Sequence, residues 1–310
     1  MATVTESQPR DSQPFAFLSV WKFIKTPFFY VFLLFWAFIC LAPLYFTLVY
    51  ALKPLANAYT PPIWWPTPFT LDNFKTVVST FNLFPRWVAN SAIIAVTTSL
   101  LRVLFCSMAG YAFARIEFPA KRLLFNGLLV SMMIPGVVTL IPQFVLVGPG
   151  FIRGGLHLGA LTIPTGFGQI DKLGGVILPT FVDAFGVFMM TQFYKSFPKE
   201  LEEAAIIDGN SRWGVFFRIV LPISQTQLLT LGLLAFQGVW NSFMFPLIIL
   251  RSPTNFTLPL GLQWFKGEYY TQYSTVLAGS LFNTVPILVL FFAFQRYFMQ
   301  SIATTGSKEG

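Results

Sequence analysis

The sequence predicts an all-α membrane protein with six transmembrane helices and both ends of the chain in the cytoplasm. Of its 310 residues, 55% are hydrophobic and only 10% are charged, whereas soluble domains carry about 25% charged residues. A soluble chain with so few charges could not cover its surface with groups that prefer water. The apolar residues also fall into long runs, and most basic residues lie between those runs. These observations place most of the chain in lipid.

The apolar runs are long enough to cross a bilayer. A spanning helix needs about 20 mostly apolar residues, because each residue rises about 1.5 Å and the hydrocarbon core is about 30 Å thick. The six expected spans are residues 28–52, 88–114, 123–147, 176–194, 219–250 and 276–298. Pro135 and Pro142 interrupt the third, and Pro222 and Pro246 lie in the long fifth. We therefore expect one membrane domain over 28–300, between tails at 1–27 and 301–310.

The basic residues predict the orientation. With a cytoplasmic N-terminus, the inside segments hold twelve Lys and Arg residues, and the longer outside loops hold seven. Basic residues concentrate on the cytoplasmic side of membrane proteins. The polar start of the chain lacks the features of a signal peptide, so we expect it to be a cytoplasmic tail.

Several other kinds of chemistry are not predicted. The net charge of +8 forms no basic stripe of the kind that binds nucleic acid, so no nucleic-acid partner is expected. Cys40 and Cys106 lie inside apolar runs, and His157 is the only histidine. These residues provide neither a disulfide framework nor a zinc-ligand cluster.

The cytoplasmic segment 195–218 between the fourth and fifth spans predicts a helix-turn-helix. Ser196 is expected to cap the first helix, and Gly209 stands where a left-handed glycine would end it. Asn210 or Ser211 can cap a second helix that leads into the fifth span.

This segment is more elaborate than a simple crossing loop requires. An interfacial helix is one alternative, but Glu200, Glu202 and Glu203 would then face an anionic leaflet, which is unfavourable. Ala204 and Ala205 are small enough to let a partner approach the helix backbone. We therefore expect a surface that docks another protein.

Motifs throughout the chain carry a resemblance to a known family. Glu203-Ala204-Ala205, Asp208-Gly209 and Leu221-Pro222 resemble the EAA loop of ATP-binding-cassette importer permeases. The similar motifs elsewhere are Asn90-Ser91, Ala109 to Arg115, Phe118-Pro119, Met133 to Pro135, Ile141-Pro142, Trp240-Asn241, Pro246-Leu247, Thr257 to Gly261 and Gln295 to Phe298. Together they are most similar to the carbohydrate-uptake branch, and within it to the maltose-permease-G-like subunit.

The resemblance implies a MetI-like importer-permease fold in which the loop over 196–209 forms a coupling helix seated on a cytoplasmic ATPase. The implied coupling residues are Glu202, Glu203, Ala204, Ala205, Asp208 and Gly209. The chain has no G-x-x-x-x-G-K-[ST] sequence to hold phosphates, so it is not expected to be an enzyme or to bind a cofactor.

The same resemblance implies an assembly. ATP and magnesium would belong to two partner ATPase subunits in the cytoplasm. A second, related permease would complete the translocation pathway, and an extracytoplasmic solute-binding protein would deliver a sugar or oligosaccharide. The implied location is the cytoplasmic (inner) membrane of a bacterium or archaeon, which the chain would cross several times.

Two charges lie within the expected spans. Arg102 falls in the second span and Asp183 in the fourth. Ionisable groups at such depth usually face the bundle interior or water and are paired. We expect an Arg102–Asp183 pair, with separate interior contacts or snorkelling as alternatives.

Polar groups in the fifth span are candidates for the pathway. Gln237, Trp240 and Asn241 combine hydrogen-bonding groups with an aromatic face that a sugar ring could use. The alternative is that they form hydrogen bonds between helices, which is the common fate of polar residues in spans.

Three other functions make different demands on the sequence. An importer permease for a non-sugar solute has the same architecture. An ion-coupled secondary transporter should show repeated broken helices and several intramembrane acids, and neither is evident. A membrane enzyme would need clustered acid and base groups, for which this chain has few residues.

Overall fold

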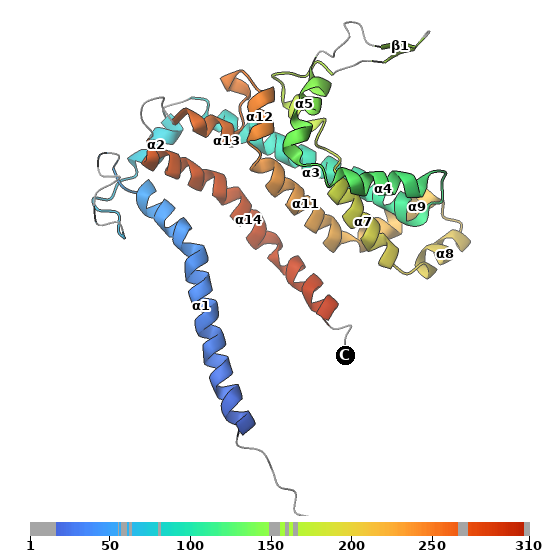
Figure 1. Cartoon of the computed structure of the whole chain (residues 1–310), viewed down its shortest axis with the longest axis horizontal. Helices are drawn as coiled ribbons and strands as arrows, with labels where there is room; N and C mark the ends of the chain where they lie inside the picture. The colour runs from blue at the N-terminus through green and yellow to red at the C-terminus, as the bar shows by residue number, and fades with distance from the viewer. Residues whose placement is uncertain are drawn as a thin grey trace, which may run out of the picture.

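The computed structural model is helical, apart from one short hairpin (Figure 1). It describes residues 17–54, 56, 61, 64–79, 82–148, 156–158, 161–163, 167–265 and 272–306. The hairpin pairs β1 (Leu156–Leu158) with antiparallel β2 (Leu161–Ile163) within the long loop over residues 148–172, which is an outer loop in the predicted topology. An all-α fold is therefore confirmed for the membrane domain, and residues 1–16 and 307–310 of the predicted tails lie outside the described residues.

Three helices of the described chain are long and apolar enough to cross a membrane on their own. They are α1 (Phe17–Ala51), α3 (Phe84–Arg115) and α14 (Tyr273–Gly306). Two further bent pairs of helices meet the same test together, so the described residues hold between three and five candidate spans. These agree with five of the six expected segments.

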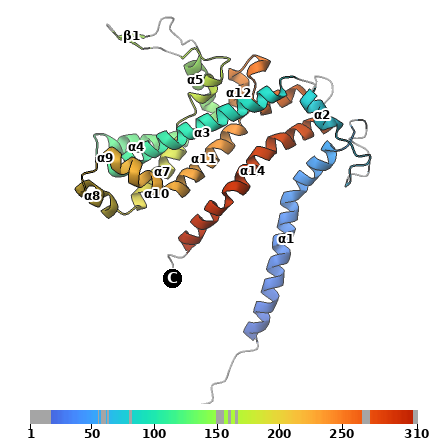
Figure 2. The same cartoon turned by 180° about the vertical axis from the view of Figure 1, so that it is seen from behind.

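Helix α1 stands apart from the rest of the molecule. Figures 1 and 2 show it meeting the body near its C-terminal end and diverging toward its N-terminus. Its spanning part, Pro27–Ala51, has none of its most apolar stretch buried within the chain. Large side chains such as Phe28, Leu34 and Phe38 are more than two-thirds exposed. Lipid or another subunit must therefore cover this helix.

The third expected span is divided by its first proline. Helix α4 (Lys121–Ser131) and helix α5 (Gly136–Val147) meet at a bend of 110°. Pro135 occupies the N-cap position of α5 with an extended backbone, which α-helix cannot continue through. Pro142 lies inside α5 without ending it. The predicted interruption is confirmed at Pro135, and Pro142 is accommodated.

The prediction of a continuous fourth span over 176–194 is wrong. Helix α6 (Leu173–Ile177) ends early, and α7 (Ala184–Ser196) begins after six non-helical residues. Pro179 lies in the gap and lacks the backbone N–H that would continue the helical hydrogen bonds. Asp183 is the N-cap residue of α7, so it lies at a helix end and not within a span.

The long fifth span is also broken into several helices. The chain passes through α9 (Arg212–Val215), a π-helical segment (Phe216–Val220) and α10 (Leu221–Ile223), and then bends by 78° into α11 (Gln225–Trp240). A second break at residues 241–243 precedes α12 (Met244–Ile249). The expectation of one long helix here is corrected.

Two hydrophobic cores hold the bundle together. The outer core joins α2 (Asp72–Ser79), the start of α3, α12, α13 (Leu258–Gly261) and α14, with two 3₁₀ turns at Pro253–Asn255 and Leu262–Phe265. Trp87, fully buried in this core, donates its indole N–H to the Pro253 carbonyl at 2.7 Å. The inner core joins the end of α3 to α7, α9, the π-helical segment and α11.

Helices α3 and α7 approach most closely at a glycine. A Cβ atom added to Gly110 would lie 2.6 Å from the Met190 Cβ and 2.9 Å from the Thr191 backbone nitrogen. Small residues allow such close helix packing in membranes. This contact lies between one and two helical turns before Arg115, the last residue of α3.

Replacing Gly110 with alanine should therefore destabilise the protein by about 1–3 kcal/mol, because backbone atoms of α7 would have to move. The matched control is Gly127→Ala on α4, where an added Cβ meets nothing within 4 Å. Thermal unfolding in detergent compares the two variants. Equal stability of both variants would contradict the close packing of α3 and α7.

Candidate functional site

A short helix, α8 (Glu200–Ile207), projects from one end of the bundle (Figure 1). It follows α7 directly and leads by a tight turn into α9, so it is the predicted cytoplasmic helix-turn-helix. The expected Ser196 cap is wrong: its hydroxyl donates to the Phe193 carbonyl within α7, and Lys199 occupies the N-cap of α8 without a side-chain bond.

The turn after α8 has the predicted geometry. Gly209 has a φ of 87°, in the left-handed region that L-residues with a side chain rarely adopt. The Gly209 N–H donates to the Ile206 carbonyl and the Asn210 N–H to the Ala205 carbonyl, each at 3.0 Å. This pair of bonds is a Schellman motif. The two bonds satisfy helix-end carbonyls and set the direction in which the chain leaves α8.

The next helix starts at the second predicted cap. The Ser211 hydroxyl accepts a hydrogen bond from the Gly214 N–H at 3.1 Å, so Ser211 caps α9. Farther along, Pro222 has no N–H for the usual helical bond. The preceding turn widens to π spacing, with the Leu221 N–H donating to the Phe216 carbonyl. This irregular stretch connects α8 to the bent helix α11.

Glu202 anchors α8 to the end of α3. Its two carboxylate oxygens accept hydrogen bonds from the Tyr111 hydroxyl at 2.8 Å and from the Arg115 Nε at 2.7 Å. Arg115 also donates to the Phe197 carbonyl just before α8. The side chains of Arg115 and Glu202 are only 8% and 10% exposed. Two charges this buried are stable only as a hydrogen-bonded pair.

This anchor corrects one expectation. Glu202 was predicted to lie on the docking surface, yet its carboxylate is occupied within the chain. Ala205 also faces inward and is 5% exposed. Glu202 and Ala205 are three residues apart, so they share one face of the helix. Of the predicted coupling residues, these two hold the helix against the bundle. The others, Glu203, Ala204, Asp208 and Gly209, are exposed.

The remaining surface of α8 is open and carries large apolar side chains. Ile207 is 85% exposed, Ile206 51% and Leu201 47%, and Glu203 and Ala204 are exposed beside them. Asp208 follows as the exposed C-cap residue. Large apolar side chains clustered on a short exposed helix are typical of a protein interaction site.

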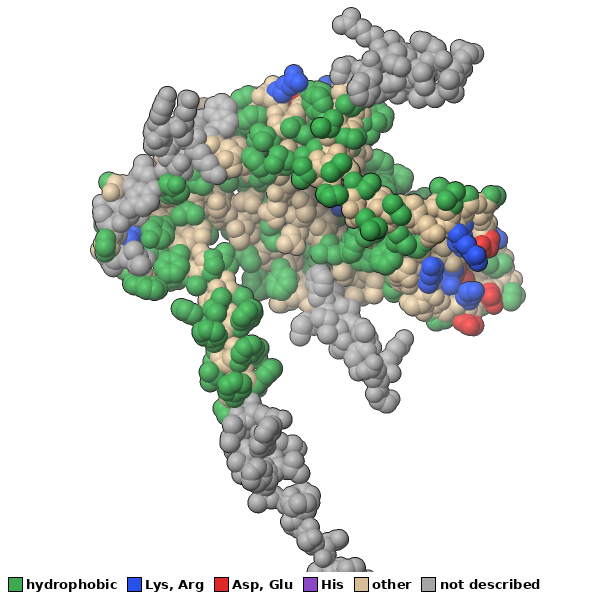
Figure 3. Space-filling view, in the orientation of Figure 1, with side chains coloured by type: hydrophobic (Ala, Val, Ile, Leu, Met, Phe, Trp, Pro, Cys, Tyr) green, Lys and Arg blue, Asp and Glu red, His purple; other side chains and the backbone are tan. Residues whose placement is uncertain are grey.

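Charge is concentrated at the same end of the molecule. In Figure 3, most Lys, Arg, Asp and Glu side chains of the visible face gather around α8 and the start of α4, and hydrophobic side chains cover much of the remainder. A lipid-embedded protein places its charges where the apolar spans end. The distribution favours this end as the membrane–water boundary.

Arg102 and Asp183 lie together between α3 and α7. The Arg102 Nε is 3.4 Å from the Asp183 Oδ1. This nitrogen makes no well-aligned hydrogen bond within the described chain, and the Nη2 of the same side chain donates to the Thr180 carbonyl. The exposed fractions of the two side chains are 16% and 32%. The Arg102 side chain thus contacts both the non-helical segment between α6 and α7 and the Asp183 carboxylate.

Neutralising Asp183 to asparagine should destabilise the protein by about 1–3 kcal/mol, because it leaves Arg102 partly buried without its counter-charge. The loss should be much smaller when Arg102 is already glutamine. A double-mutant cycle of unfolding free energies measures this coupling. Strictly additive losses would contradict the pair.

Of the candidate pathway residues, Trp240 is internal. It is 3% exposed, stacks on Phe236 with ring centroids 5.5 Å apart, and donates its indole N–H to the Asn283 carbonyl at 2.9 Å. This is the helix-to-helix bond that formed the alternative interpretation. The placement of Trp240 on a pathway surface is therefore corrected. Asn241 is exposed, and its side-chain oxygen accepts from the Asn283 amide at 3.1 Å.

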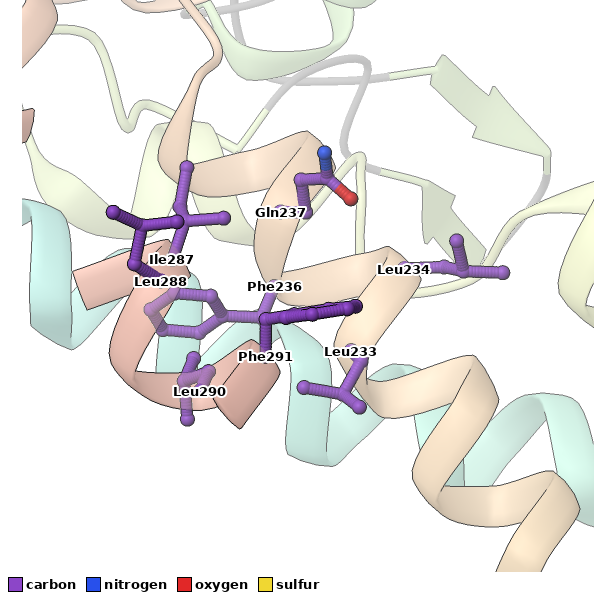
Figure 4. Close-up of a pocket in the computed structure, with 8 residues that line it drawn as sticks. All are labelled: Leu233, Leu234, Phe236, Gln237, Ile287, Leu288, Leu290 and Phe291. Atoms are coloured by element: carbon purple, nitrogen blue, oxygen red, sulfur yellow. The ribbon is translucent and has the colours of Figure 1, made fainter. Parts of the chain in front are cut away.

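Gln237 lines an apolar groove of about 190 Å³ between α11 and α14. Figure 4 shows its amide among the lining side chains, where it is the only polar member. The other lining residues are leucines, an isoleucine and phenylalanines from the two helices. Gln237 and Asn241 therefore share an exposed polar edge of α11.

An aspartate ties the outer segments to each other. Asp171 accepts backbone N–H bonds from Arg251 and Ser252, both at 2.9 Å, and its carbonyl accepts from the Asn255 amide. Partial burial acts to raise the pKa of Asp171. The hydrogen bonds from Ser252 and its neighbours outweigh that effect and lower the pKa to about 2. This cluster joins the end of the long outer loop to the segment after α12.

The lowered pKa predicts an acid-sensitive contact. A carboxylate with a depressed pKa stabilises the fold at pH values above its ordinary pKa of 3.8, and this contribution is lost as the pH falls toward about 2. The Asp171→Asn variant should therefore lose less unfolding free energy than the unchanged protein as the pH falls from 3.8 toward about 2. Unfolding followed from pH 5 downward tests it. An unchanged acid response in the variant would contradict the prediction.

Two sets of contacts were not predicted. Tyr111 and Arg115 belong to the motif Ala109 to Arg115, for which the sequence predicts no contact, yet both bind the Glu202 carboxylate. Asn90 donates to the Thr254 and Phe256 carbonyls at 3.0 and 2.9 Å, and Ser91 accepts from the Leu258 N–H at 2.7 Å. The one available signal was a basic residue, Arg115, at a span end close to an acid-rich loop.

Bent apolar helices, with a short exposed helix and most of the charges at one end, fit a membrane permease. Residues 102–304 match the family described as the binding-protein-dependent transport system inner membrane component. The chain belongs to this family. It is therefore a permease subunit of an ATP-binding-cassette importer, and ATP hydrolysis in such systems belongs to a separate subunit.

Curated relatives cover most of the chain. The arabinooligosaccharides transport system permease protein AraQ of Halalkalibacterium halodurans is 36% identical, over 88% of this chain and 92% of the relative. AraQ of Bacillus subtilis is 32% identical, over 78% and 80%. The lactose transport system permease protein LacG of Rhizobium radiobacter is 30% identical, over 69% and 72%.

A solved structure shares the fold. A chain of a bacterial ABC transporter involved in the import of the acidic polysaccharide alginate superposes with a TM-score of 0.71. The match covers 95% of this chain and all of the other, at 18% identity. The MetI-like permease fold expected from the resemblance is therefore confirmed at the level of architecture.

Proposed function

We propose that this protein is a carbohydrate-importing permease that forms half of the pathway for an oligosaccharide. The printed names of its relatives support this substrate class, since they include arabinooligosaccharides and lactose. A related importer permease that carries a non-sugar solute is the second candidate, because the architecture is the same.

The observation that carries the coupling mechanism is the two-sided character of α8. Its inner face is bound to α3 through Glu202, and its outer face presents Glu203, Ala204 and Ile207. A partner that moves the outer face would move α3 with it, because the two helices share a buried ion pair. The partner is a cytoplasmic ATPase subunit, which holds the ATP and magnesium.

The rest of the assembly follows from what the chain leaves uncovered. Because the faces of α1 are exposed in the single chain, we expect a second permease subunit to lie beside this one. In this proposal the chain crosses the cytoplasmic membrane six times, with the broken segment of α6 and α7 as the fourth crossing. Both termini and α8 then lie in the cytoplasm, on the ATPase side. A solute-binding protein delivers the sugar from outside; a related alginate transporter was solved with a substrate-bound periplasmic protein.

Gln237 and Asn241 are the proposed pathway residues of this chain. They lie on one exposed edge of α11, next to the apolar groove that α14 completes. Amide groups can bind sugar hydroxyls, and the neighbouring phenylalanines offer apolar surface to the C–H faces of a sugar ring.

The docking role of α8 is tested by enlarging its outer face. Ala204→Trp should prevent a close approach to the α8 backbone, so we expect at least a tenfold loss of co-purified ATPase and of transport. Ala89→Trp, at an exposed alanine in α3, is the matched control and should retain the ATPase. Undiminished ATPase binding and uptake by the Ala204 variant would refute docking at α8.

The substrate class requires a separate measurement. Uptake of labelled oligosaccharides and of labelled amino acids is compared in cells with and without the chain. Chain-dependent uptake of a saccharide supports the proposal. Uptake of only a non-sugar solute would favour the second candidate.

A further inference from the structure

A basic groove lies at the end of the bundle that carries α8. It has a volume of about 740 Å³ and lies between the end of α3, the start of α4 and the end of α7. The lining residues used below are Phe113, Glu117, Lys121, Arg122, Phe125 and Lys195. No residue of α8 lines this groove.

The floor of the groove is aromatic. The Phe113 ring lies 5.4 Å from the Phe125 ring and 5.7 Å from the Phe118 ring, measured between centroids. The Lys195 ammonium lies 4.9 Å from the centroid of the Phe125 ring. Three adjoining rings offer an apolar surface beneath a cationic group.

The rim carries an excess of positive charge. Lys121 is paired with Glu117 at 2.8 Å. Arg122 and Lys195 have no carboxylate partner among the residues that the structure describes. Three cations and one anion therefore leave two positive charges for a ligand. The ligand must supply negative charge at the rim and apolar groups at the floor.

The surroundings identify where such a ligand comes from. Helix α4 has no buried residue, and Leu123, Leu124 and Val130 are 73%, 55% and 60% exposed. This helix therefore presents apolar surface to lipid. The groove lies at its charged N-terminal end, at the level where headgroups would meet acyl chains. An acidic protein segment would match the charge and leave the aromatic floor open toward lipid.

We propose that this groove binds an anionic glycerophospholipid of the cytoplasmic leaflet. Arg122 and Lys195 hold the headgroup phosphate, and the glycerol and upper acyl chain rest on Phe113 and Phe125. Basic pockets between membrane helices on the cytoplasmic side bind anionic headgroups in this way. The inference rests on the proposed orientation in the membrane.

The test is lipid binding by the purified full chain, measured by native mass spectrometry in detergent. The probes are phosphatidylglycerol, phosphatidylcholine with identical acyl chains, and inorganic phosphate. Arg122→Gln combined with Lys195→Gln should weaken phosphatidylglycerol binding about 25-fold, because each basic group contributes about a fivefold factor. Arg218→Gln combined with Lys172→Gln removes the same charges from exposed positions outside the groove and should leave binding unchanged.

Three results would overturn the proposal. The first is equal phosphatidylglycerol binding by the two double variants. The second is displacement of the lipid by inorganic phosphate at comparable concentration, which would define a simple anion site. The third is cross-linking of an Arg122→Cys variant to the ATPase in the assembled importer, which would assign the groove to a protein interface. Lipid binding is measured without ATPase or sugar. A failure of the docking or transport tests therefore does not change the result of the lipid-binding test.

Discussion

Replacing Glu202 with alanine should lower the free energy of unfolding by about 3–5 kcal/mol, because it leaves a buried guanidinium without its counter-charge. Arg115 is held by the Glu202 carboxylate at 2.7 Å, and Tyr111 loses its acceptor in the same change. The loss is read from unfolding in mixed detergent micelles. It is the largest effect expected for any carboxylate of α8.

The adjacent glutamate is the natural control. Glu203 is exposed and lies on the outer face of α8, so Glu203→Ala should change stability by less than about 0.5 kcal/mol. The two substitutions remove the same group from neighbouring positions and differ only in which face they affect. Similar unfolding free energies for both variants would show that Glu202 does not anchor the helix.

Transport separates the two glutamates further. A Glu202→Gln variant keeps the shape of the side chain and loses its charge. Because the proposed force passes from α8 to α3 through this contact, we expect the variant to hydrolyse more ATP for each sugar imported, even where the ATPase remains bound. An unchanged ratio of hydrolysis to uptake would confine Glu202 to a stabilising role.

Replacing Trp87 with alanine should also cost about 3–5 kcal/mol, since it empties the centre of the outer core. Trp87 is fully buried, its ring packs against Gly261, and its indole N–H binds the Pro253 carbonyl. The loss should appear as a lower unfolding free energy and as increased proteolysis of the segment around Pro253.

Trp87→Phe is the matched control. Phenylalanine retains much of the ring packing and lacks the N–H, so its loss should be close to the value of one buried hydrogen bond plus a small cavity, about 1–3 kcal/mol. If the alanine variant were no less stable than the phenylalanine variant, the packing of Trp87 on α13 would be disproved.

Local chemistry was the most predictable part of the site. Gly209 has the expected left-handed backbone, and Ser211 caps the next helix. Both depend on contacts within a few residues of the chain, which sequence specifies directly. Ser196 failed as a cap because α7 extends through it, so its hydroxyl binds within that helix.

The apolar runs predicted where the membrane segments lie and much less about their shape. Composition shows that residues 176–194 prefer lipid, but the chain is non-helical from Leu178 to Asp183. Such a break is tolerated in a membrane only where other groups satisfy the freed backbone. Here the Arg102 guanidinium binds the Thr180 carbonyl. That partner lies 78 residues away in the chain.

The sequence by itself determined the class of fold, the short helix α8 with its Gly209 turn, and the family resemblance, because hydropathy and helix-end signals are local. Only the tertiary structure decided which face of α8 turns inward. Two neighbouring glutamates have the same chemistry, and the difference between Glu202 and Glu203 arises from Tyr111 and Arg115, 91 and 87 residues earlier. Burial of an ion pair depends on what other helices place beside it, and a one-dimensional pattern does not contain that information.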